Sequence, residues 1–148
     1  MKIAVIGGGN GGYAAAADLS EQGHAVSLWR RDPARAAATP NPLFLRDHKG
    51  ERPTPITEIT ADLAKALEGA ALIVCPTPAT SHDSVAAAIA LHLVSGQVVF
   101  LPPGTFGSFI FAKALRAAGS DADVAFAEAG TLPYLARKRG PAEIAITT

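Results

Sequence analysis

The feature that most constrains the fold is a glycine-rich turn between an apolar run and an alanine-rich segment. Gly7, Gly9 and Gly12 have the spacing G-x-G-x-x-G, directly after the apolar run Lys2–Ile6. The pattern after Gly12 predicts a helix over Gly11–Gln22. A strand, a tight turn and a helix in immediate succession are the context in which this glycine spacing has a physical meaning.

Each glycine in this turn has a separate role. Gly7 permits the tight turn, Gly9 lets a ligand approach the backbone, and Gly12 lets the helix pack closely on the strand. The first turn of a helix carries amides without intrahelical partners, and Asn10 and Gly11 supply two of them. These amides and the helix dipole favour an anion, so the turn predicts a pyrophosphate site and hence a dinucleotide cofactor.

Short apolar runs alternate with helical patterns along the chain, which predicts an α/β Rossmann fold: a doubly wound, mostly parallel sheet with helices on both faces. The expected strands are Lys2–Ile6, Ala25–Trp29, Ile56–Thr60, Ala71–Cys75, Gln97–Leu101 and Val124–Glu128. The expected helices are Gly11–Gln22, Ala34–Ala38, Ala61–Leu67, Ser81–Leu93 and Phe106–Ala118.

Two regions depart from this rhythm. Thr39–Pro55 contains four prolines and a Lys-Gly pair, which favours a hairpin-like excursion. Tyr134–Arg137 and Glu143–Thr147 are expected as extended segments that add to the edge of the sheet. The sequence has no internal repeat and no linker, so residues 1–148 are expected to form one domain.

The end of the second strand indicates which cofactor is preferred. Arg30 follows the strand directly, where an NAD-binding domain usually places an acidic residue that accepts from the ribose hydroxyls. A guanidinium pairs instead with a 2′-phosphate, so Arg30 and Arg31 favour NADP over NAD. The alternative is that both arginines are solvated surface charges and that Asp32 reaches back to the ribose.

Other candidate residues lie at later strand ends. Thr77 and Pro78 follow the fourth strand and are expected to wall the cofactor, although proline beyond a strand is also what structure alone demands. His82 opens the next helix, where an orienting or capping role is favoured over that of a catalytic base. Cys75 ends a buried strand and is interpreted as a core residue.

Composition excludes several classes of protein. The 13 basic and 13 acidic residues balance, which argues against nucleic-acid or membrane-surface binding. One cysteine permits neither an internal disulfide nor a cysteine-based metal cluster, and no metal site is assigned. No apolar stretch approaches the ~18 residues that span a bilayer. A cytoplasmic location is expected.

Three segments together resemble the opine dehydrogenases of the octopine and nopaline type. They are Ile6–Gly12, Pro78–His82 and Leu101–Gly104, and Glu128–Arg137 with Gly140 and Pro141 extends the resemblance along the whole chain. Pro102 departs from the family, which commonly has Asn there. The first segment also resembles glycerol-3-phosphate dehydrogenase and ketopantoate reductase.

The resemblance implies an NAD(P)-dependent oxidoreductase that condenses an amino acid with a 2-oxo acid, or catalyses the reverse. The family's proton-transferring residues lie in a C-terminal helical domain, so the chain is expected to be the cofactor-binding domain alone. No catalytic residue is assigned to it, and turnover is expected only if a second domain is supplied. Alternatives are the cofactor domain of one of the neighbouring dehydrogenases, or a regulatory module without catalysis. A homodimer is compatible with an exposed docking face.

Overall fold

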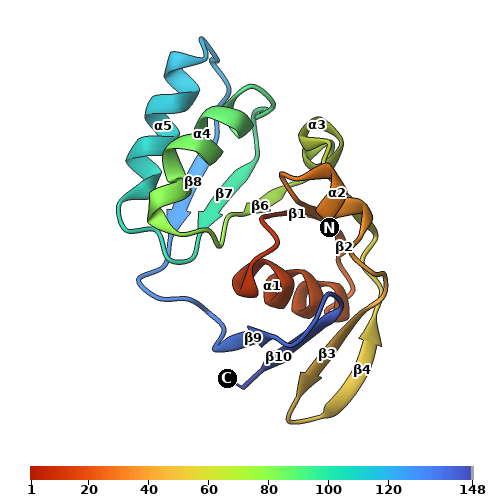
Figure 1. Ribbon diagram of the computed structural model, residues 1–148. Helices are drawn as coiled ribbons and strands as arrows, with labels where there is room; N and C mark the ends of the chain where they lie inside the picture. Colours follow the sequence, from red (N-terminus) through yellow and green to blue (C-terminus); the bar gives the residue numbers. More distant parts are fainter. Residues whose placement is uncertain (148) are drawn as a thin grey trace.

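A computed structural model describes residues 1–147 of the chain (Figure 1). Its main sheet has six parallel strands. Their order is β5-β2-β1-β6-β7-β8, which is the doubly wound Rossmann order. The strands are β1 (Lys2–Ile6), β2 (Ala25–Trp29), β5 (Glu58–Thr60), β6 (Leu72–Val74), β7 (Val98–Leu101) and β8 (Ala125–Glu128). The predicted fold class is therefore confirmed.

The helices lie close to their predicted positions. They are α1 (Asn10–Glu21), α2 (Pro33–Ala37), α3 (Leu63–Leu67), α4 (His82–Ala90, after a short 3-10 turn at Ala79–Ser81) and α5 (Gly107–Ala117). Local signals explain several ends. Asp32 and Asp62 accept backbone hydrogen bonds as N-caps of α2 and α3, and Gly23 takes a left-handed φ of 84° after α1.

Both faces of the main sheet are buried along its central strands β1 and β2, which is why these strands are largely apolar, whereas the edge strands β5 and β8 are partly exposed. In β1, Ala4 and Ile6 face a core shared with α3, α4 and α5, whereas Ile3 and Val5 face a second core. That second core contains the buried face of α1, including the run Ala14–Ala17. Alanines let α1 lie close to the strands beneath it.

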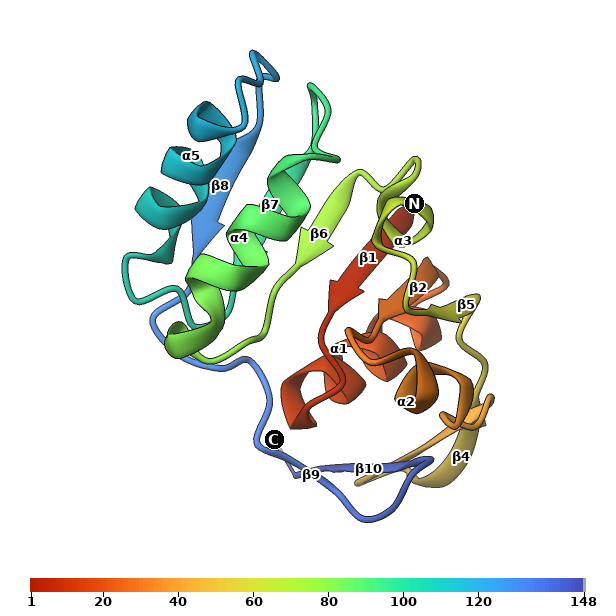
Figure 2. The same ribbon diagram turned by 45° about the horizontal axis from the view of Figure 1, so that its top comes forward.

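A second, four-stranded sheet covers the outer side of α1 (Figure 2). Its order is β4-β3-β10-β9, from β3 (Leu43–Asp47), β4 (Gly50–Thr54), β9 (Ala136–Lys138) and β10 (Glu143–Ile146). The predicted hairpin in Thr39–Pro55 is thus confirmed as β3 and β4. The molecule is layered as helices, main sheet, α1 and second sheet.

The expected placement of the C-terminal strands was wrong. Tyr134–Arg137 and Glu143–Thr147 were expected at the edge of the main sheet, but β10 pairs in parallel with β3 and antiparallel with β9. The reason is packing: Ile144 and Ala136 bury against α1 together with Leu43 and Leu45 of β3. The main sheet ends at β8 instead.

Within the described range, no helix combines the length and the apolarity that crossing a bilayer requires.

Candidate functional site

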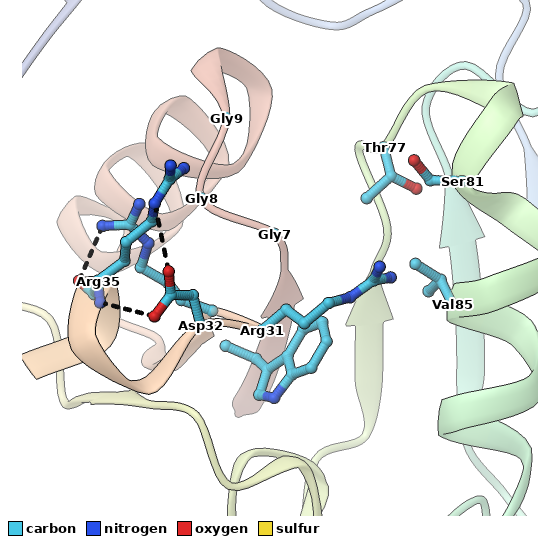
Figure 3. Close-up of a pocket in the computed structure, with 11 residues that line it drawn as sticks. Gly7, Gly8, Gly9, Arg31, Asp32, Arg35, Thr77, Ser81 and Val85 are labelled. Carbon is cyan, nitrogen blue, oxygen red and sulfur yellow. Dashed lines mark hydrogen bonds and ion pairs between the residues drawn. The ribbon is translucent and has the colours of Figure 1, made fainter.

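A cleft of about 460 Å³ opens at the carboxyl ends of β1, β2 and β6 (Figure 3). The point between β1 and β6 is where the strand order reverses, which is where doubly wound sheets bind their ligands. The residues that line the cleft are Gly7, Gly8, Gly9, Trp29, Arg30, Arg31, Asp32, Arg35, Thr77, Ser81 and Val85.

The glycine turn has the geometry that its spacing predicts. Gly7 has a φ of 109°, and a Cβ on Gly12 would overlap the carbonyl oxygen of Gly7. A Cβ on Gly9, in contrast, would meet no atom within 4 Å. The backbone at Gly9 is therefore open to a ligand, while Gly12 is required for the close approach of α1 to β1.

The N-terminus of α1 begins beside the cleft without a side-chain cap. Gly9 is its N-cap residue, and no side chain caps the helix there. The first-turn amides of Asn10, Gly11 and Gly12 thus lack intrahelical acceptors, as at any helix start. The side chain of Asn10 is occupied elsewhere, because its Oδ1 accepts from the Lys138 N–H at 3.0 Å.

Arg30 lies beside the glycine turn, but it is not a freely solvated charge. Its Nη1 donates to the Tyr13 hydroxyl and the Arg35 carbonyl, each at 3.1 Å, and to the Thr39 hydroxyl. A Cβ on Gly8 would collide with the Arg30 Nε. The guanidinium is therefore fixed against the turn by oxygens that are neutral.

Arg31 extends across the cleft toward α4 (Figure 3). Its Nη2 donates to the Ser84 Oγ at 3.0 Å. Asp32 also lines the cleft: its Oδ1 accepts from the Ala34 N–H at 2.9 Å and from the Arg35 N–H, and its Oδ2 lies 3.4 Å from the Arg35 Nε. Three arginines and one occupied carboxylate make the cleft electropositive.

Thr77 and Pro78, which were both expected to wall the cofactor, differ in their position relative to the cleft. Thr77 lines the cleft, and its Oγ1 is buried without a hydrogen-bond partner among residues 1–147. A buried hydroxyl without a partner is unusual and fits a ligand that supplies one. Pro78 is exposed and lies outside the cleft lining. Asn10, Gly11 and Gly12, which the sequence also assigns to the cofactor site, form the start of α1 behind Gly9.

The ends of β7 and β8 border a different, smaller cleft, which Thr105, Phe106 and Glu128 line. The Glu128 carboxylate accepts from the Ser108 N–H at 2.6 Å and the Phe106 N–H at 3.0 Å, at the start of α5. Hydrogen bonds from Ser108 and Phe106 hold the pKa of the Glu128 carboxyl below its usual range. Glu128 is thus a structural cap of α5.

His82 does not cap α4 as expected. It is fully buried, and its ring meets the Phe111 ring edge-on at a centroid distance of 5.8 Å. Neither ring nitrogen has a hydrogen-bond partner in the described part of the chain. Cys75 is fully buried as expected, and burial raises the pKa of its thiol far above the ordinary range.

Sequence reasoning missed Lys138, Tyr13 and Thr39. Tyr13 is fully buried in α1, and its ring lies 3.5 Å from the Lys138 Nζ. Thr39 ends the α2 segment and binds Arg30 through its hydroxyl. The only local signal was the basic run at residues 137–139, and nothing in it indicates contact with a turn 130 residues earlier.

Comparison with known proteins decides the family. The family model described as the NAD-dependent glycerol-3-phosphate dehydrogenase N-terminus matches residues 2–102. The chain belongs to this family. The matched range includes the glycine turn, the residues that line the cleft and the strands β1 to β6.

Individual relatives extend the likeness to the whole chain. An opine dehydrogenase from Arthrobacter sp. (strain 1C) is 32% identical over 97% of this chain, which spans 40% of that enzyme. A glycerol-3-phosphate dehydrogenase (NAD(P)+) from Nitratidesulfovibrio vulgaris (strain DP4) is 39% identical over 67% of this chain and 30% of its own length. The predicted resemblance to opine dehydrogenases is confirmed, and these relatives are oxidoreductases.

A solved structure supports the fold. Octopine dehydrogenase in complex with NADH and agmatine superposes with a TM-score of 0.87 over 99% of this chain and 39% of that protein, at 21% identity. The chain therefore spans about two fifths of the opine-type dehydrogenases that it matches.

Proposed function

We propose that this chain is the nicotinamide-dinucleotide-binding domain of an opine-type dehydrogenase. The observation that carries the proposal is the glycine turn: Gly9 is open to the cleft, Gly12 is packed against Gly7, and the first amides of α1 are uncapped. A pyrophosphate needs this combination of close backbone approach and unpaired amides.

Different residues of the cleft are proposed to bind different parts of such a cofactor. The amides of Asn10 and Gly11 are placed to donate to the pyrophosphate, and the orphaned Thr77 hydroxyl is placed to bond the cofactor beyond it. The bound nicotinamide supplies a hydride. Pro78 lies outside the cleft lining, and its role here is to set the direction of the chain after β6.

NADPH is proposed as the preferred form of the cofactor. Arg30 is fixed beside Gly8 and Arg31 crosses the cleft, so both guanidinium groups border the place where the adenosine ribose is read in this fold. Asp32, the carboxylate that an NAD-binding mode would need, is engaged as the N-cap of α2. A 2′-phosphate is matched by these cations, and the Asp32 carboxylate is partly neutralised by the Arg35 Nε at 3.4 Å.

Titration of the purified chain with NADPH and NADH tests both statements. Tighter binding of NADPH is expected, and Arg30→Asp is expected to weaken NADPH by at least tenfold and to reduce or reverse the preference. The control is Lys113→Asp, the same charge reversal at an exposed position on α5. An unchanged preference in Arg30→Asp would refute the assignment of NADP.

The reaction proposed for the intact enzyme is the NAD(P)H-dependent condensation of an amino acid with a 2-oxo acid, or its reverse. The likeness to the Arthrobacter opine dehydrogenase over 97% of the chain supports it. A second candidate is reduction of a phosphorylated ketone, which the identity of 39% to a glycerol-3-phosphate dehydrogenase favours. Oxidation of NADPH in the presence of each substrate class, with a protein that includes the remaining length of the relatives, separates the two. Binding without turnover on any pair would favour a regulatory module.

A further inference from the structure

Two cationic side chains that are far apart in the sequence, Arg30 and Lys138, lie against the ring of Tyr13. The Lys138 Nζ lies 3.5 Å from the centroid of the Tyr13 ring, and the Arg30 Cζ lies 5.7 Å from it. Within residues 1–147, neither Arg30 nor Lys138 forms a salt bridge. Both positive charges thus lie against the Tyr13 side chain without a carboxylate partner in the described part of the chain.

Both cations border the same glycine. The Lys138 Nζ donates to the Gly8 carbonyl at 3.4 Å, and the Arg30 Nε lies so close to Gly8 that a Cβ there would collide with it. Gly8 itself lines the cleft at the end of β1. Arg30 therefore lines the cleft beside Gly8, and Lys138 reaches the same glycine from β9.

The guanidinium of Arg30 is held so that one edge is free. All three of its hydrogen bonds use Nη1, with Tyr13, Arg35 and Thr39 as acceptors. Nε and Nη2 donate to no group in the described chain, so a two-pronged edge is left for an anion. A guanidinium edge of this kind matches two oxygens of a phosphate, and an ammonium adds a point charge.

The position of the Lys138 backbone is fixed by a hydrogen bond that does not involve its side chain. Its backbone N–H donates to the Asn10 Oδ1 at 3.0 Å, which fixes β9 to the start of α1. The side chain then lies along the Tyr13 ring toward Gly8. A substitution at Lys138 can therefore remove the charge and leave this backbone link in place.

We infer that Lys138 and Arg30 form a two-cation site for a phosphomonoester, which takes the 2′-phosphate of NADPH. The inference rests on the proposed function. Unpaired cations in close proximity repel each other, and a dianion beside Gly8 removes that cost. The pyrophosphate has its own donors in the α1 amides, so the cations beside Gly8 are left for the phosphate on the ribose.

The test measures affinities of Lys138→Met, which keeps an apolar stem of similar length, and of Lys138→Arg. The ligands are NADPH, NADH, adenosine 2′-phosphate and adenosine 5′-phosphate, with Lys113→Met as the control. We expect Lys138→Met to weaken NADPH and adenosine 2′-phosphate by about tenfold and to change NADH and adenosine 5′-phosphate by less than about twofold. Lys138→Arg keeps the charge and is expected to retain most of the affinity.

Several results would overturn the inference. One is unchanged NADPH binding in a folded Lys138→Met variant, with a melting temperature like that of the wild type. Another is equal weakening of NADPH and NADH, which would assign Lys138 to the pyrophosphate. If the wild type binds neither dinucleotide, the proposed function fails. In that case binding of adenosine 2′-phosphate that depends on Lys138 would still support the two-cation site.

Discussion

A Cβ atom on Gly12 would overlap the carbonyl oxygen of Gly7, because α1 starts directly against the end of β1. The obstacle is backbone and not a side chain, so no rotamer change relieves it. The same turn leaves Gly9 free of any neighbour within 4 Å. Stability and ligand binding thus depend on different glycines.

Gly12→Ala is expected to destabilise the fold, because the helix must move away from the strand. Overpacking of this kind typically costs about 1–3 kcal/mol, which lowers the melting temperature of a chain of this size by several degrees. Gly9→Ala is expected to lower the melting temperature less than Gly12→Ala does, since alanine in place of a glycine N-cap costs about 0.5–1 kcal/mol. It should nevertheless weaken dinucleotide binding. Equal thermal stability of the two variants would contradict this division.

Gly107→Ala is expected to destabilise the protein through His82. A Cβ on Gly107 would collide with the buried imidazole ring, although alanine is the better helix former. The measurement is a double-mutant cycle with His82→Ala, in which the smaller side chain makes room. The cost of Gly107→Ala should fall by at least about 1 kcal/mol in that background. Gly130→Ala, where a Cβ meets nothing within 4 Å, is the control. Additive effects would show that the ring is not the obstacle.

Glu128 is expected to make stability depend on pH. Its pKa is lowered by hydrogen bonds from Ser108 and Phe106, so the ionised form is favoured in the folded state. Its contribution is present above the unfolded value near 4.5 and is lost as the pH falls through the lowered folded pKa. Melting temperatures of wild type and Glu128→Gln should differ at pH 7 and converge in acid. Glu51→Gln, an exposed carboxylate on the hairpin, is the control. A difference that grows in acid would have the wrong sign.

Cys75 is expected to be unreactive in the folded protein. Its thiol is fully buried, and burial raises its pKa, so the reactive thiolate is scarce at neutral pH. A chromogenic disulfide reagent at pH 8 should label the native chain slowly and the urea-unfolded chain at once. Rapid labelling under native conditions would place the thiol in an accessible, opened state.

The parts of the fold that local sequence determines were predictable. Lys2–Ile6 and Ala25–Trp29 match β1 and β2 residue for residue, because a buried parallel strand is a continuous apolar run with sharp ends. The partner of β10 was not predictable. Glu143–Ile146 is as suitable for one sheet edge as for another, and only the packing of Ile144 against α1 selects β3.

The candidate site likewise has a part that the sequence predicts and a part that it does not. The glycine turn and Arg30 are found from spacing, since their roles follow from their distance to one strand. Tyr13 and Lys138 meet only because β9 crosses the start of α1, a contact that bridges 128 residues through Asn10. The orphaned Thr77 hydroxyl likewise requires coordinates, because burial of a single atom leaves no pattern in the sequence.

The second sheet has a consequence for where this protein can be divided. Residues 2–102 contain the glycine turn, but the outer flank of α1 is covered by β10 and β9 from beyond residue 135. A fragment cut after β8 would retain all six strands of the main sheet and yet expose the ring of Tyr13 and lose Lys138. We therefore expect a fragment cut after β8 to expose the apolar side of α1 and to bind the cofactor more weakly than a chain that includes β9 and β10.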